Sequence, residues 1–204
     1  QYIIKGISHF PKSKEAQNVI LQGIRDDHWK VRQEAIKSAK EMDLKDAIPF
    51  LIYRAKNDSE KVIKDEAFVS IGALNTKEGN EFLISQLTDK KASDSNKTKA
   101  VEVLLKQEKG NGDKEIVELA EKTLEDDKLK TLRYAIGKEI AKYDKAVFAD
   151  VCIKYLSSKD NEQDIADWVK IPDTQSDDSK LKFTLDTRNI PNYDELAKED
   201  NLYI

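Results

Sequence analysis

The sequence predicts an all-α fold: a right-handed α-solenoid of about five helix pairs, followed by an irregular C-terminal extension. Three observations predict it. The 204-residue chain is 36% charged and holds seven Gly and four Pro, a composition that favours helices over sheets. A similar segment recurs about every 32 residues. Apolar residues inside each segment recur three and four positions apart, which is the spacing of one helix face.

The repeat is clearest around two alanines, Ala35 and Ala67. Superposing them also aligns Arg32 with Lys64, each three residues earlier. Comparable small residues continue the series at Ala100, Ala135 and Ala166, with successive spacings of 32, 33, 35 and 31. We expect these alanines to face the core between helices, because a small side chain lets two helices approach closely.

Each repeat contains two helical patterns. The first helices carry their apolar residues within 20–24, 48–55, 82–87, 116–124 and 148–156, and the second helices within 31–42, 63–74, 100–105, 132–140 and 165–169. Asp and Ser residues before the second helices suit N-caps, and Pro49 suits a first turn, where its missing N–H costs little. Turn signals at Asn75-Thr76 and Asn111-Gly112 separate the units.

Residues 2–10 fit the same period. A shift of 32 residues places Ile4 on Ile36 and Phe10 on Met42. This segment is therefore expected to be the second helix of a pair whose first helix precedes Gln1, so that the chain is a piece of a longer solenoid. The alternative is a single capping helix.

The segment Asp27 to Ala35, which has the pattern Asp-x-x-x-Val-Arg-x-x-Ala, resembles the HEAT or HEAT-like repeat, the variety also found in phycobilisome lyases. The resemblance covers about residues 12–170. It implies an all-α solenoid that acts as a protein-interaction scaffold and offers a long curved surface to a protein or peptide partner. Departures in later units, such as Lys97 and Gln163 in place of the arginine, argue against a regular Asp–Arg ladder.

The charge distribution bears on partners. The chain holds 35 Lys and Arg against 39 Asp and Glu, and residues 172–204 contain four basic and eight acidic residues. Residues 1–171 are therefore neutral, which gives no general attraction to nucleic acid or anionic lipid. No run of about 18 apolar residues exists, so we expect no membrane-spanning helix. We therefore expect no nucleic-acid partner and no direct insertion into a membrane, although the neutral total leaves room for a local charged patch.

Residues suited to catalysis are sparse. His9 and His28 lie on different predicted helices without converging ligands, so we expect no metal and assign them surface or cap roles. Cys152 lies on an apolar helix face and is expected to be a buried thiol. The Gly110-Asn111-Gly112 segment lacks the Lys-Ser/Thr of a phosphate loop and reads as a turn. We expect no enzymatic activity, no catalytic residues and no cofactor.

Five residues are candidates for a repeat ladder or an interaction surface: Asp27, Trp29, Arg32, Lys64 and Arg133. We expect Arg32, Lys64 and Lys97 to bond Asp side chains and helix termini between units, the alternative being a row that faces a ligand. HEAT-like DNA glycosylases use Trp and Asp residues in a basic groove, and Trp29 is superficially similar. The neutral body favours packing or rim exposure for Trp29, and disfavours a glycosylase-like or lyase-like role.

The C-terminal extension is expected to begin at residue 172, after a solenoid of residues 1–171. Lys180 to Asp186 alternates polar and apolar residues, as an extended segment does. We expect this acidic segment to dock on the solenoid, by capping the last helix pair or by occupying the groove as a partner would. The alternative is that another molecule orders it. The candidate anchors are Leu181, Phe183, Leu185 and Tyr203.

The chain starts at Gln1 without a Met, which gives a weak lean towards an exported or periplasmic protein that has been processed. A cytoplasmic location stays open.

Overall fold

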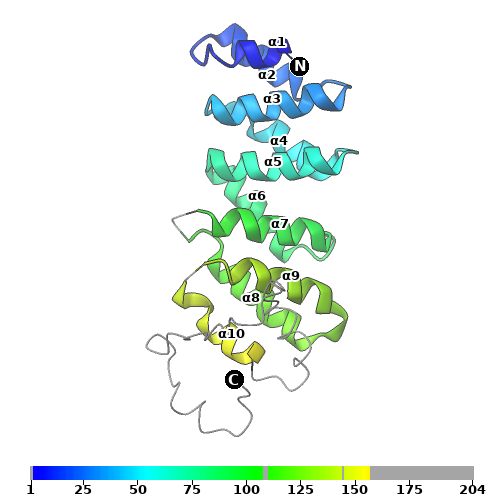
Figure 1. Ribbon diagram of the computed structural model, residues 1–204, viewed down its shortest axis with the longest axis vertical. Helices are drawn as coiled ribbons and strands as arrows, with labels where there is room; N and C mark the ends of the chain where they lie inside the picture. Colours follow the sequence, from blue (N-terminus) through cyan, green and yellow to red (C-terminus); the bar gives the residue numbers. More distant parts are fainter. Residues whose placement is uncertain (1, 108–109, 144, 157–204) are drawn as a thin grey trace, which may run out of the picture. The chain divides into compact units, whose positions relative to one another are not determined.

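The computed structural model describes residues 2–107, 110–143 and 145–156. The chain divides into two compact units, residues 1–147 and 148–204, and only residues 148–156 of the second unit are described. Every regular element in the described part is helical, which confirms the predicted all-α solenoid (Figure 1). The expected domain boundary at residue 171, the tail anchors and Ala166 lie outside the described residues.

Nine α-helices follow one another in the described part of the first unit. They are α1 (Tyr2–Ile7), α2 (Lys14–Gly23), α3 (Trp29–Glu41), α4 (Ile48–Asn57), α5 (Lys61–Leu74), α6 (Lys77–Thr88), α7 (Asp94–Leu105), α8 (Asp113–Glu125) and α9 (Lys130–Ile140). The described part of the second unit holds α10 (Ala149–Leu156). Short 3₁₀ turns lie at Lys45–Ala47, Asp127–Leu129 and Ala146–Phe148.

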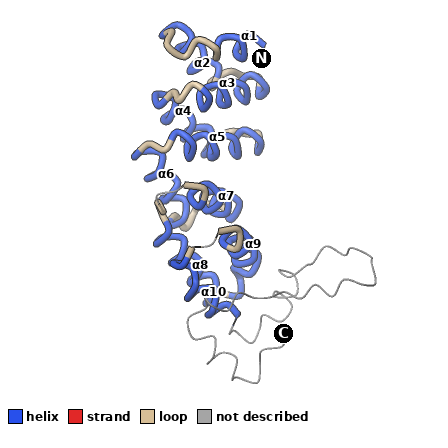
Figure 2. The backbone as a smooth tube through the Cα atoms, turned by 60° about the vertical axis from the view of Figure 1, so that its left-hand side comes forward, coloured by secondary structure: helices blue, strands red, loops and turns tan. Residues whose placement is uncertain are grey.

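The helices of the first unit alternate between two layers (Figure 2). In one layer α3 packs on α5, α5 on α7 and α7 on α9, and α1 packs on α3. In the other layer α4 packs on α6 and α6 on α8. Each second helix also packs on the first helix of its own pair, so a pair buries its apolar faces only when its neighbours are in place.

Local signals set where the helices begin. The hydroxyl of Ser13 accepts a hydrogen bond from the Ala16 N–H at the start of α2, and Thr76 and Ser93 cap α6 and α7 in the same way. The ring of His28 caps α3 by accepting from the Lys30 N–H, which is the cap role expected for a histidine outside any metal site. Caps of this kind satisfy N–H groups that have no partner inside the helix.

The core lies between the two layers, and the repeat alanines mark it. Ala35, Ala67 and Ala100 are each 0% exposed, as the 32-residue period predicted. Gly72 shows how close second helices come: a Cβ built on it would clash with Cγ1 of Val103 on the next second helix. Close approach at this point therefore depends on the missing side chain.

Ala135 was expected to face the core between helices, but the fully buried residue at the equivalent position is Ile136, one residue later. Arg133 on α9 is as buried as Arg32 on α3, both 6% exposed. Three residues after each arginine comes a fully buried apolar residue, which is Ala35 in α3 but Ile136 in α9. Ala135 is only half-buried, because the buried guanidinium of Arg133 fixes the rotation of α9 about its axis. In this unit the buried arginine, and not the alanine, is the residue that corresponds in position to the first repeat.

Candidate functional site

One aspartate turn is repeated along the stack. In the turn before a second helix, the side chain of an aspartate accepts a hydrogen bond from the backbone N–H two residues later. The four aspartates and their distances are Asp26 (2.8 Å), Asp58 (3.0 Å), Asp89 (2.8 Å) and Asp126 (2.9 Å). An aspartate that bonds the backbone two residues on is a common turn-forming device, so the repeat encodes its turns locally.

At one of these turns the aspartate also forms a buried ion pair. Asp58 accepts hydrogen bonds from Nε and Nη2 of Arg32, both at 2.8 Å, in a bidentate arrangement. Arg32 belongs to α3, and Asp58 directly follows α4 of the next pair as its C-cap residue. The side chains of Arg32 and Asp58 are 7% and 0% exposed. A bidentate pair of this kind fixes geometry as well as adding attraction.

Further hydrogen bonds connect the Arg32–Asp58 pair and its neighbour Arg54 to the turn at residues 24–27. Nη1 of Arg32 donates to the carbonyl oxygens of Asp26 and Asp27, at 3.0 and 2.8 Å. Arg54 on α4 donates from Nε to the Ile24 carbonyl at 2.8 Å, and its Nη1 lies 3.5 Å from the Asp58 carboxylate. Two guanidinium groups thus join the turn at residues 24–27 to the turn at Asp58. This arrangement stabilises the contact between two units.

The other candidate ladder residues are placed differently. The backbone carbonyl of Asp27 accepts a hydrogen bond from Arg32, whereas Asp27 as a residue is exposed. Lys64 and Lys97 are half-buried, and neither forms an ion pair with another described residue. Arg133 donates from Nε to the Thr123 carbonyl at 2.9 Å and lies 3.5 Å from Asp127, within its own helix pair. The arginine–aspartate bond between units is thus present at Arg32 but not repeated at these positions.

Trp29 lies at the rim of the stack, at the first turn of α3. It is 37% exposed, its ring stacks on His28 with centroids 6.5 Å apart, and the ammonium of Lys30 lies 5.5 Å from the ring. Its neighbours in sequence thus cover one part of the ring and leave another part in solvent.

Asp58 and Arg54 are structurally important residues that the sequence interpretation did not single out. Asp58 follows Asp26 at a spacing of 32 residues, so the repeat contained a signal for its turn. Nothing in that spacing distinguishes the buried Asp58 from the exposed Asp26. The difference arises from Arg32, which reaches Asp58 across the contact between units.

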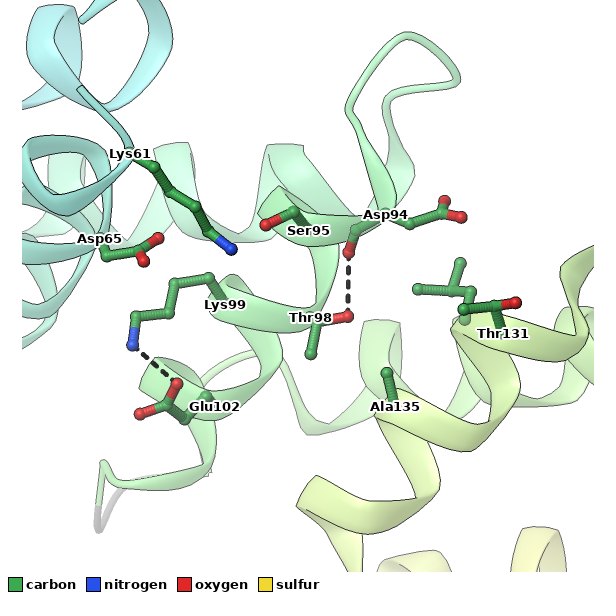
Figure 3. A pocket seen from close by; sticks show the side chains of 10 residues that line it. Lys61, Asp65, Asp94, Ser95, Thr98, Lys99, Glu102, Thr131 and Ala135 are labelled. Carbon is green, nitrogen blue, oxygen red and sulfur yellow. Dashed lines mark hydrogen bonds and ion pairs between the residues drawn. The ribbon is translucent and has the colours of Figure 1, made fainter. Parts of the chain in front are cut away.

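A groove of about 380 Å³ crosses three neighbouring second helices in the first unit (Figure 3). We call it the α5–α9 groove. Its lining residues are Lys61 and Asp65 from α5, Asp94, Ser95, Thr98, Lys99 and Glu102 from α7, and Thr131, Leu132 and Ala135 from α9. Leu132 and Ala135 supply a small apolar part, and the rest of the lining is charged or carries hydroxyl groups.

Part of the charge in the α5–α9 groove is already neutralised. Glu102 accepts from the ammonium groups of Lys99 at 2.8 Å and Lys106 at 2.6 Å. Burial of Glu102 would raise the pKa of its carboxyl, but the hydrogen bonds and charges of Lys106 and Lys99 outweigh it and lower that pKa below its ordinary value. This glutamate is therefore a carboxylate at neutral pH.

The remaining charged groups have no such partner within the described residues. Lys61, Asp65 and Asp94 form no ion pair there, and the side chains of Ser95 and Thr131 make no hydrogen bond there. The Thr98 hydroxyl donates to the Asp94 carbonyl at 2.9 Å and can still accept. The groove thus offers one ammonium, two carboxylates and several hydroxyls to a bound chain.

The described residues contain no group of three His, Cys, Asp or Glu placed to hold a metal ion. In that same part of the chain, none of the helices is both long and apolar enough to cross a bilayer.

The two layers of paired helices, the repeated aspartate turn and the ion pair between units define a helical-repeat solenoid of the HEAT-like class. The chain matches the family model described as spirochaete HEAT repeat protein over residues 1–169, and it belongs to that family. A comparison with curated proteins gave no match.

Proposed function

We propose that this protein is a non-catalytic scaffold that binds a protein or peptide segment in the α5–α9 groove. The main support for the proposal is the groove, because it combines side chains from three consecutive units that have no partner among the described residues. A helical-repeat stack presents such a face to partners without a lid or an enclosed cavity. The family supports a repeat scaffold as the general role.

The lining of the groove favours a polypeptide over a small molecule. Sites for small ligands are mostly apolar with a few polar groups, whereas eight of the ten lining residues here are charged or are Thr or Ser. Protein interfaces tolerate polar and wet surfaces of this kind, since bridging waters serve nearly as well as direct hydrogen bonds. A polypeptide also supplies both donors and acceptors along its backbone.

Site-specific photo-crosslinking tests this proposal on the full chain. A photoreactive amino acid at Ala135 is exposed to an extract of the source cells, and crosslinked peptides are identified by mass spectrometry. We expect a defined set of peptides at Ala135. A photoreactive residue at Lys122, on α8 in the other layer, is the matched control and should not capture that set.

A blocking variant makes the result specific. Thr98→Arg fills the middle of the groove while leaving the buried Leu132 in place. We expect Thr98→Arg to abolish the crosslinks at Ala135 without lowering the unfolding temperature by more than a few degrees. Identical peptides at Lys122 and Ala135, or crosslinks that survive Thr98→Arg, would contradict a binding site in the groove.

We also propose that nucleic acid is not a partner. Titration of labelled DNA and RNA into the full chain at physiological salt should show no affinity above the non-specific level, about 10⁻⁴ to 10⁻⁶ M. A sub-micromolar affinity that weakens steeply with salt would instead support the nucleic-acid-processing alternative. Loss of that affinity in Trp29→Ala would then assign the contact to Trp29.

A further inference from the structure

We infer that the α5–α9 groove selects an extended peptide that carries one acidic and one basic side chain about three residues apart. This inference rests on the proposed binding function of the groove and specifies the chemistry of its ligand. It starts from the groups of the groove that no described residue neutralises: Lys61, Asp65 and Asp94.

These groups are distributed unevenly along the groove. Figure 3 shows the ammonium of Lys61 extending from α5 into the groove, while the carboxylate of Asp94 extends to the side formed by α9. Lys99, the other lining cation, is held by Glu102 at 2.8 Å. The groove therefore presents a positive group towards α5 and a negative group towards α9. Asp65 lies one turn after Lys61 on α5. Its negative charge offsets the positive field at that end of the groove, except close to the Lys61 ammonium itself.

The geometry of stacked helices sets the spacing of the two complementary charges. Packed helices lie about 8–10 Å apart, and Lys61 and Asp94 begin two adjacent second helices, α5 and α7. An extended chain advances about 3.3 Å per residue, so three residues span that distance. A peptide that crosses the helices can thus place an acidic side chain at Lys61 and a basic one at Asp94.

The middle of the groove suits the residues between those charges. Thr98 and Ser95 lie on α7 between the two ends, and their hydroxyls can bond a peptide backbone. Ala135 and Leu132 leave room for a small apolar side chain beyond Asp94. Because the peptide can run in either direction, the groove selects the separation of the two charges in the peptide and not their order.

Peptide pools of fixed charge pattern test the inference on the full chain. Each pool has seven residues with charges at positions 2 and 5 and random uncharged residues elsewhere. One pool combines an acid with a base, a second has two acids, and a third has two bases. We expect the mixed pool to bind two- to fivefold more tightly than either like-charge pool, as estimated for exposed ion pairs worth about 0.2–1 kcal/mol each. The preference should weaken at high salt.

Charge reversal in the groove should change the preference in a defined way. Lys61→Glu should favour the pool with two bases, and Asp94→Lys the pool with two acids. The double variant Lys61→Glu/Asp94→Lys should again prefer the mixed pool. The matched controls are Lys14→Glu and Glu78→Lys, which make the same charge changes in the first turns of α2 and α6 and should leave the preference unaltered.

The outcomes separate this inference from the proposed function. If all three pools bind equally and Thr98→Arg removes that binding, the groove binds peptides without the charge pattern, and this inference is wrong. If no pool binds, or if Thr98→Arg leaves binding intact, both the inference and the binding site in the groove are contradicted. Folding of each variant is checked by circular dichroism before the affinities are compared.

Discussion

Arg32 and Asp58 lie 26 positions apart in sequence and are joined by two hydrogen bonds of 2.8 Å, with both side chains removed from solvent. The pair connects the second helix of one unit to the end of the first helix of the next. Since a solenoid has only nearest-neighbour contacts, one such pair strengthens a whole junction between units.

Removing one partner of this pair is expected to be strongly destabilising. Arg32→Ala leaves the buried Asp58 carboxylate with the Glu60 N–H of its own turn and the longer contact to Arg54, and it also frees the carbonyls of Asp26 and Asp27. Breaking a buried pair typically costs about 3–5 kcal/mol, which urea unfolding of the full chain would measure. Lys77→Ala, in the exposed Lys77–Glu81 pair, is the control and should cost no more than about 1 kcal/mol. Equal losses in the two variants would contradict the role given to Arg32.

Two alanine substitutions should differ because their positions in the core differ. Ala67→Leu inserts bulk at a site with 0% exposure and should cost about 1–3 kcal/mol of unfolding free energy. Ala135→Leu extends into the α5–α9 groove and should cost much less, because the side chain has open space. Thermal unfolding of both variants provides the comparison. A greater loss at Ala135 would contradict the register assigned to α9.

The close approach of α5 and α7 can be tested at Gly72. Gly72→Ala brings a methyl group against Val103, and the resulting shift should outweigh the gain in helix propensity of about 1 kcal/mol. Gly72→Ala combined with Val103→Ala removes the clash and should recover part of the lost stability. Chemical denaturation of the wild type, both single variants and the double variant measures this coupling. Additive effects in that set would show that the two groups do not meet.

Glu102 should contribute a small, pH-dependent stabilisation. Its pKa is lower in the folded protein than the usual unfolded value of about 4.3, so the contribution is present above that value and is lost as pH falls through the folded pKa. Solvent screening limits it to about 0.5 kcal/mol. Stability curves between about pH 3 and 6 should therefore be flatter for Glu102→Gln than for the wild type. A steeper curve for the variant would reverse the assigned sign.

The thiol of Cys152 should react slowly near neutral pH. Cys152 is half-buried and not fully buried as the sequence predicted, and this partial burial raises the pKa of the thiol above its ordinary value, so the nucleophilic thiolate is scarce. Alkylation with iodoacetamide, followed by mass spectrometry across a pH series, should show half-maximal reactivity at a higher pH than for a free cysteine in a peptide. The denatured chain serves as the internal control. A native reaction as fast as the denatured one would show that the thiol is not shielded.

The sequence by itself determined the fold class, the helix positions and most of the core in the described units. In a two-helix repeat the signals for structure are local in sequence. The spacing of apolar residues sets the buried faces, Ser and Thr cap the helices, and Asp forms the turns. Ala35, Ala67 and Ala100 could be placed in the core from spacing alone, because their neighbours repeat with them. The same reasoning pointed to Arg32 as a residue that joins units.

Only the tertiary structure decided which charges are buried, which are paired and which are left to a partner. Asp26 and Asp58 make the same turn, yet only Asp58 receives an arginine from the preceding unit. Both Ala135 and Ile136 were expected on the core face of α9, but only Ile136 is fully buried, because the buried Arg133 sets the rotation of the helix. The α5–α9 groove joins residues up to 74 positions apart, from Lys61 to Ala135. Such relations depend on how far each side chain reaches across a helix–helix contact, and a one-dimensional period does not contain that distance.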